Sequence, residues 1–310
     1  MTRPRVRSSD AEHVASSDAE DAADHTTGPR CAPGWPSRLV EEASRPPAAP
    51  GAVVRGSTPV VFFGDPAVAS VATLGINPSP RQFVHQNGVL RQGPDRRLAT
   101  LPWLGLGSWD ELDRDAGQRI LAECAAYFEP GRAPYRRWFD PFDRVLVEGL
   151  GVSYYDGRAC HLNLVPWATH PVWRDLDRAE WGRLAEAALP FLVGQLEVAG
   201  YRVVVVNGRT VMDEVAAAGV VEWSTDVRLP GPPAAQLCVG EAAGTFYAGW
   251  TCNLQNQPGA ARLAGDLARW LRSVAEVSDR HTERLRYQPR KSTAKVSTTS
   301  SPSTTCRRSW

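Results

Sequence analysis

The chain has 310 residues, 43% of them hydrophobic and 22% charged, which is typical of a globular protein with one large domain or two small ones. Its formal net charge of +1 neither indicates nor excludes a nucleic-acid partner, because a local basic patch can form on a neutral chain. The 6 cysteines include no C-x-x-C pair, which excludes a disulfide framework and argues against a metal site, so we expect a cytoplasmic protein with reduced thiols, no cofactor and no membrane span.

The two ends of the chain lack the pattern of a hydrophobic core. Residues 1–50 are rich in Ala, Ser, Asp, Glu and Pro, and residues 278–310 form a basic Ser/Thr-rich tail. Such segments bury too little apolar surface to offset the entropy of ordering, so we expect both to be disordered. For the tail, an arm that attracts nucleic acid is the alternative to a solvated segment. We expect residues 51–277 to form a single folded domain.

Strands and helices alternate through this domain. In chain order we predict a strand at 59–63, a strand at 68–74, a helix opened by a Ser108–Glu111 capping box and ending at 128, a helix at 135–149 interrupted by Pro141, a strand at 160–165, a helix at 177–198 kinked or split by Pro190, a strand at 201–206, a short helix ending at 215, strands at 235–239 and 245–250, and a final helix at 258–277. This alternation predicts a three-layer α/β/α fold, with helices covering both faces of a mostly parallel central sheet.

The second strand ends abruptly at the turn Gly75-Ile76-Asn77-Pro78. Gly75 allows the backbone to approach a ligand closely, and Pro78 biases Asn77 toward an extended conformation. One amide side chain is thereby held just past the carboxyl end of a strand, at the edge where open α/β sheets bind ligands. A turn without function is the alternative interpretation.

Two further asparagines lie at strand ends. Asn163 belongs to the strand at 160–165, and Asn253 follows the strand at 245–250. A structural amide bonded to backbone is the alternative for Asn163, and a loop or cap residue is the alternative for Asn253. If the three amides share one cleft, their donors and acceptors suit the edge of a nucleobase. Asparagine is a poor general base but can orient water, so hydrolysis of an N-glycosidic bond fits better than hydrolysis of a peptide or phosphodiester bond.

The Gly75-Ile76-Asn77-Pro78 turn resembles the first motif of the uracil-DNA glycosylase superfamily, especially of its mismatch-specific uracil/thymine branch. The resemblance implies a uracil-DNA glycosylase-like fold, with Asn77 orienting the hydrolytic water. It also implies that Asn163, within Leu162-Asn163-Leu164-Val165, reads the base and that Asn253 is a second catalytic residue. The segment from Gln255 to Gly259 would be the wedge that props the duplex open after base flipping.

Other residues near these motifs are candidates for substrate contacts. We expect Gly75, Gln255 and Gln257 to contact the substrate and Phe83 to stack on the base, with a core phenylalanine as the alternative. The arginines expected at the rim of the cleft, where an ordinary solvated face is the alternative, are Arg81, Arg91, Arg96 and Arg97. Trp167, Trp173 and Trp181 are expected to be core or groove wall, with platforms for stacked bases as the alternative.

Together these features predict a monomeric, uracil-DNA glycosylase-like hydrolase of base excision repair. It would cleave the N-glycosidic bond of a flipped uracil, or of a related damaged or mismatched base, in DNA. Pro-Ser, which the superfamily has directly after its last His or Asn, does not follow Asn253. That difference favours the first alternative, a catalytically degraded module of the same fold that binds nucleic acid or a nucleotide. The second alternative is another small-molecule α/β enzyme.

Overall fold

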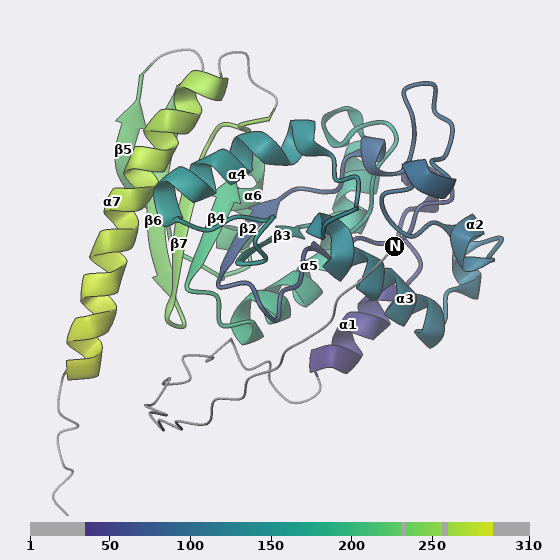
Figure 1. The fold of residues 1–310 in the computed structure, drawn as a ribbon, viewed down its shortest axis with the longest axis horizontal. Coiled ribbons are helices and arrows are strands. Elements are labelled where there is room, and N and C mark those ends of the chain that lie inside the picture. The colour runs from purple at the N-terminus through teal and green to yellow at the C-terminus, as the bar shows by residue number, and fades with distance from the viewer. Residues whose placement is uncertain (1–34, 231–233, 256–259, 288–310) are drawn as a thin grey trace, which may run out of the picture.

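A seven-stranded sheet lies at the centre of the protein, with the strand order β1-β3-β2-β4-β7-β6-β5 (Figure 1). The computed structural model describes residues 35–230, 234–255 and 260–287. Four central strands run parallel to one another, namely β3 (Ala159–Asn163), β2 (Val71–Gly75), β4 (Val203–Asn207) and β7 (Thr245–Trp250). Antiparallel strands flank this core: β1 (Phe62–Phe63) on one side, and β6 (Ala235–Ala242) and β5 (Ser224–Leu229) on the other.

The central strands are apolar because helices cover both faces of the sheet. Every residue of β2, β3 and β4 is buried, as expected for parallel strands between two helical layers. The run Val203–Val206 is therefore the most apolar strand of the chain as well as one of the most buried. The predicted α/β class with a parallel core is confirmed.

Helices α4 (Arg136–Leu150) and α7 (Ala260–Tyr287) lie side by side across one face of the sheet (Figure 1). Gly149 permits their close approach, since a Cβ atom there would lie 3.1 Å from the Ala268 carbonyl oxygen. On the opposite face, α6 (Arg209–Ala217) places Met212 against Gly249 of β7. Helix α5 (Arg178–Val198) also covers this second face, beside Phe62.

Residues 35–50 are part of the folded domain, which corrects the prediction that all of 1–50 is disordered. Helix α1 (Trp35–Ala43) packs against α3 (Arg114–Ala125), and Ala43 is fully buried. The contact includes a hydrogen bond of 2.8 Å from Ser44 Oγ to the Asp113 carbonyl oxygen. Helix α1 has few aliphatic residues, so its burial comes from its tertiary partner rather than from a recognisable local pattern.

At the other end, α7 continues to Tyr287, ten residues beyond the predicted boundary at 277. Residues 1–34 and 288–310, which hold the rest of the two segments predicted to be disordered, lie outside the described residues. No helix in the described part of the chain has the length and apolar character needed to cross a membrane.

Two helix predictions are corrected by packing. Pro141 and Pro190 lie inside continuous helices, so neither proline splits its helix, because buried residues on either side of each proline hold the helix in place. Ser108 and Glu111 do form a hydrogen bond of 3.1 Å, but they enclose only a short 3₁₀ turn at Trp109–Glu111. Helix α3 begins instead at Arg114, where Asp113 Oδ1 accepts a hydrogen bond of 2.8 Å from the Ala116 N–H. The sequence also gave no indication of the short helix α2 (Leu101–Leu104) or of the exposed edge strand β5.

Candidate functional site

A cleft of about 1020 Å³ opens at the carboxyl edge of the parallel strands. Asn77 after β2, Asn207 at the end of β4 and Asn253 after β7 all line it. In the sheet, β2 lies between β3 on one side and β4 on the other. The chain therefore leaves β2 toward β3, whereas it leaves β4 toward the opposite edge of the sheet. The two connections diverge and open a crevice between β2 and β4, which is the usual ligand site of such sheets.

The side chain of Asn77 is held in one orientation by its amide nitrogen. Nδ2 donates to the Trp167 carbonyl oxygen at 3.1 Å and to Thr169 Oγ1 at 3.2 Å. A carbonyl oxygen can only accept, so the nitrogen of the amide must face Trp167. No described residue donates to Asn77 Oδ1, and the residue is partly exposed at the cleft. The arrangement leaves a fixed acceptor that a water molecule in the cleft can use.

Asn207 organises the loop that follows β7. This buried side chain accepts hydrogen bonds at Oδ1 from Trp250 Nε1 at 2.8 Å and from the Leu254 N–H at 3.1 Å. Its Nδ2 donates to Gln255 Oε1 at 2.7 Å. The Asn207 carbonyl therefore uses both of its acceptor positions on Trp250 and Leu254, and its amide nitrogen holds the side chain of Gln255, which lines the cleft.

Asn253 presents a donor to the same cleft. Its Oδ1 accepts a hydrogen bond of 3.1 Å from the Gln255 N–H, a local turn that occupies the carbonyl group. Its Nδ2 makes no hydrogen bond with any described residue. The cleft thus combines a fixed acceptor from Asn77 with a donor from Asn253, and Gly75 and Gln255 line it as well.

Asn163 does not line the cleft, so the prediction that three asparagines share it is wrong for this residue. It lies at the end of β3 in register with Gly75 and is 5% exposed. Its Nδ2 donates to the Val60 carbonyl oxygen at 3.1 Å. Asn163 is therefore the backbone-bonded structural amide that was the alternative interpretation, and it ties β3 to the segment preceding β1.

The buried side chain of His161 lies beside Gly75, a residue that lines the cleft. A Cβ atom at residue 75 would lie 3.0 Å from His161 Cε1 and 3.1 Å from Nε2, so a larger residue there would force the imidazole ring to shift. His161 Nδ1 is 2.7 Å from Thr73 Oγ1, which is 2.6 Å from the Tyr154 hydroxyl. Burial lowers the pKa of His161 to about 3, while the neighbouring Asn163 side chain acts in the opposite direction. The imidazole is therefore neutral near neutral pH.

The predicted stacking residue is also corrected. Phe83 is fully buried in the hydrophobic core and does not line the cleft, because the 3₁₀ turn Pro80–Gln82 directs the following residue inward. Other aromatic side chains line the cleft instead, namely Tyr135, Trp138, Trp173 and Trp181. Gln257 lies outside the described residues.

Of the four arginines predicted at the rim, only Arg81 lines the cleft. Arg91 and Arg97 donate to the Arg81 carbonyl oxygen at 3.0 and 3.1 Å, so they support the backbone of that residue. The other arginines of the cleft are Arg137, Arg174 and Arg178. Among the described residues that line the cleft, none is acidic.

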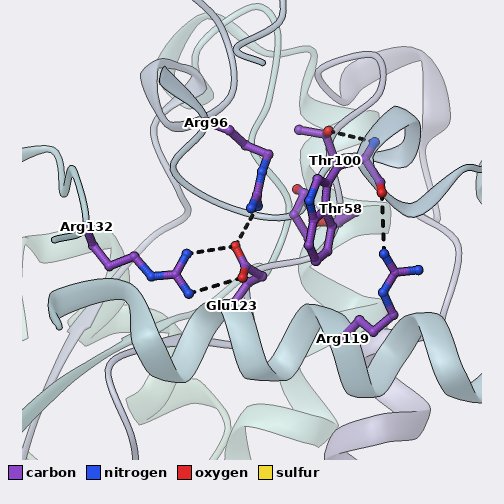
Figure 2. Close-up of polar contacts among 8 residues, drawn as sticks. Thr58, Arg96, Thr100, Arg119, Glu123 and Arg132 are labelled. Atoms are coloured by element: carbon purple, nitrogen blue, oxygen red, sulfur yellow. Dashed lines mark hydrogen bonds and ion pairs between the residues drawn. The ribbon is translucent and has the colours of Figure 1, made fainter. Parts of the chain in front are cut away.

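Arg96 belongs to an ion-pair cluster rather than to the cleft. Figure 2 shows Glu123 between Arg96 and Arg132, at 2.5 and 3.1 Å respectively. Burial alone would raise the pKa of Glu123, but hydrogen bonds from Arg132 and Arg96 outweigh it and lower the pKa. The Arg96 guanidinium also lies 4.1 Å from the centre of the Trp103 ring. These contacts make Arg96 a structural residue.

Sequence reasoning missed Asn207 as a site residue, although a signal was present. Asn207 ends the most apolar strand and precedes Gly208, whose φ of 105° is strongly unfavourable for other residues. That glycine lets the chain turn sharply from β4 into α6, which places Asn207 at the cleft. Arg137, Trp138 and Arg178 gave no comparable local signal, because they reach the cleft from the first turns of helices.

Comparisons with protein-family models and with curated protein sequences give no match to this chain. Among the described residues, no three His, Cys, Asp or Glu side chains gather in an arrangement able to hold a metal ion. Four cysteines of the described part, Cys124, Cys160, Cys238 and Cys252, are buried free thiols. The site must therefore be interpreted from its amides, aromatic rings and arginines.

Proposed function

We propose that this protein is a uracil-DNA glycosylase-like hydrolase that acts on a flipped uracil, or a related damaged or mismatched base, in DNA. One observation carries the proposal: Asn77 is anchored through its amide nitrogen and offers Oδ1 to a cleft at the point where the strand order reverses. The Gly75-Ile76-Asn77-Pro78 turn that supplies this residue is the motif that resembles the glycosylase superfamily.

The proposed chemistry needs orientation of water more than proton abstraction. The bond between the base and the sugar C1′ breaks first, leaving an oxocarbenium-like sugar and an anionic base. Asn77 Oδ1 accepts a hydrogen bond from water and holds the water oxygen toward C1′. The new C–O bond forms as the water proton passes to solvent, and the departing base takes a proton from solvent. Positioned groups of this kind typically contribute about 10²–10⁴-fold in rate.

The rest of the cleft suits a nucleotide. Asn253 Nδ2 can donate a hydrogen bond to a carbonyl oxygen of the base, where negative charge develops as the base leaves. Trp138 and Tyr135 supply aromatic faces, and Arg81 and Arg137 supply positive charge for phosphate groups. Cleft volumes of about 300–1,000 Å³ are usual for small ligands, and this cleft reaches the upper end of that range.

A second candidate function is binding of nucleic acid without hydrolysis. It is favoured by the absence of an acidic side chain among the described residues that line the cleft, because a carboxylate would be the natural stabiliser of an oxocarbenium ion. In that case the amides would recognise a base and the arginines would hold the phosphates, with no bond broken.

Base release from a panel of oligonucleotides containing uracil, hypoxanthine or a mismatched thymine separates the two functions. Abasic sites are detected by cleavage of the strand in alkali. We expect release from one of these substrates, and we expect Asn77→Ala to lower the rate about 10²–10⁴-fold with unchanged affinity. Asn87→Ala is the matched control, since this exposed amide only caps a turn with Val89. Binding without release from any substrate would favour the second function, and equal rates for Asn77→Ala and the parent would remove Asn77 from the mechanism.

A further inference from the structure

One wall of the cleft carries alternating aromatic and cationic side chains. This wall comprises residues 172–181, of which Trp173, Arg174, Arg178 and Trp181 line the cleft; we call it the tryptophan wall. Trp173 lies in the 3₁₀ turn Trp173–Asp175, and Trp181 lies in the first turn of α5. Their ring centres are 5.6 Å apart with an angle of 53° between the planes, and both residues are partly exposed. Both tryptophans pack against the hydrophobic core and also line the cleft, so each ring presents part of its surface to a ligand there.

The charge that the tryptophan wall presents to the cleft is positive. Arg178 is exposed and makes no ion pair with a described residue. Arg174 has one weak partner, Asp175, at 3.6 Å, with both side chains largely exposed. Neither of the other acidic residues of the segment, Asp177 and Glu180, lines the cleft, and Asp177 accepts a hydrogen bond of 2.8 Å from the Ala179 N–H.

Aromatic rings interleaved with arginines are the usual means of binding single-stranded nucleic acid. Each base of a single strand offers a free face for stacking, whereas the bases of a duplex are stacked on one another. Arginine side chains beside the rings meet the phosphates that link those bases. Arg81 and Arg137 also line the cleft, so a bound strand would meet positive charge from elements outside the tryptophan wall as well.

We infer that the tryptophan wall binds unpaired nucleotides next to the target base, so that the protein prefers single-stranded to duplex DNA. This inference rests on the proposed function for the identity of the target site. It concerns affinity for undamaged flanking nucleotides, which can be measured whether or not a base is released.

The test is fluorescence anisotropy of the full chain with one labelled oligonucleotide, undamaged, as a single strand and as a duplex. We expect tighter binding of the single strand. Trp173→Ala and Trp181→Ala should each weaken single-strand binding by about 5- to 150-fold and affect duplex binding much less. Arg178→Ala should reduce the slope of log affinity against log salt concentration by about 0.7 on the single strand.

Matched controls separate binding from stability. Trp103→Ala removes another partly exposed tryptophan, which lies outside the cleft under Arg96 and Arg119. Arg183→Ala removes an exposed arginine of α5 that does not line the cleft. Both should keep the parent's single-strand affinity. Trp181→Phe should restore most of the binding, because it retains an aromatic face.

Equal binding of single strand and duplex, or undiminished single-strand affinity in folded Trp173→Ala and Trp181→Ala, would overturn the inference. Base release from a single-stranded substrate at subsaturating concentration that is unaffected by these substitutions would likewise refute it while leaving the hydrolase proposal intact. The converse result, loss of single-strand binding in the variants without release of any base by the parent, would support the tryptophan wall and refute hydrolysis.

Discussion

His161 should make the stability of the protein depend on pH in mildly acidic solution. The ring is 1% exposed and its pKa is about 3, against an ordinary value of 6.5. Below the ordinary value the unfolded chain takes up a proton that the folded protein cannot accept, so stability is fully present above it and is lost progressively as the pH falls toward the folded pKa. Each pH unit in this window lowers the free energy of unfolding by up to about 1.4 kcal/mol, which amounts to about 2 kcal/mol between about pH 7 and pH 5.

Urea unfolding at these two pH values measures the effect, and His161→Asn isolates it from other titrating groups. Asparagine keeps a polar atom near Thr73 but does not titrate, so the variant should lose about 2 kcal/mol less than the parent over the same interval. His170→Asn is the control, because His170 is exposed. The same loss in the parent and in His161→Asn would show that His161 is not buried as a neutral ring.

Three further predictions concern two residues of the cleft and the contrast between Arg96 and Arg81. Gly75→Ala should destabilise the protein by about 1–3 kcal/mol in urea unfolding, because the added methyl group would crowd His161. The control Gly182→Ala should not destabilise the protein, because the space around Gly182 is open. Asn207→Ala should cost about 2–4 kcal/mol by leaving the Trp250 and Leu254 donors without an acceptor, and Asn207→Asp should cost less. Arg96→Ala should lower the free energy of unfolding by about 1 kcal/mol without changing DNA affinity. Arg81→Ala should weaken DNA binding with little effect on stability. The opposite pattern would show that Arg96, rather than Arg81, contacts DNA at the rim of the cleft.

The sequence by itself determined the buried central strands and the position of Asn77. A run such as Val203–Val206 can be stable only when buried on both faces, so its composition specifies a central strand without knowledge of its neighbours. The turn after β2 is equally local, since Gly75 and Pro78 act on the backbone within a few residues of Asn77. In a parallel sheet the carboxyl ends of the strands share one edge, which is why Asn77 and Asn253 could be predicted to lie in one cleft.

Which strand ends face the cleft was decided only by the tertiary structure. Asn163 and Asn207 both end apolar strands, but the cleft forms between the parallel strands β2 and β4, where the strand order reverses, so Asn207 lines it and Asn163 does not. That choice depends on strand order, which no local pattern encodes. The different roles of Arg96 and Arg178 have the same cause. Arg96 pairs with Glu123 and Arg178 lines the cleft, and both outcomes depend on residues that are distant in the sequence.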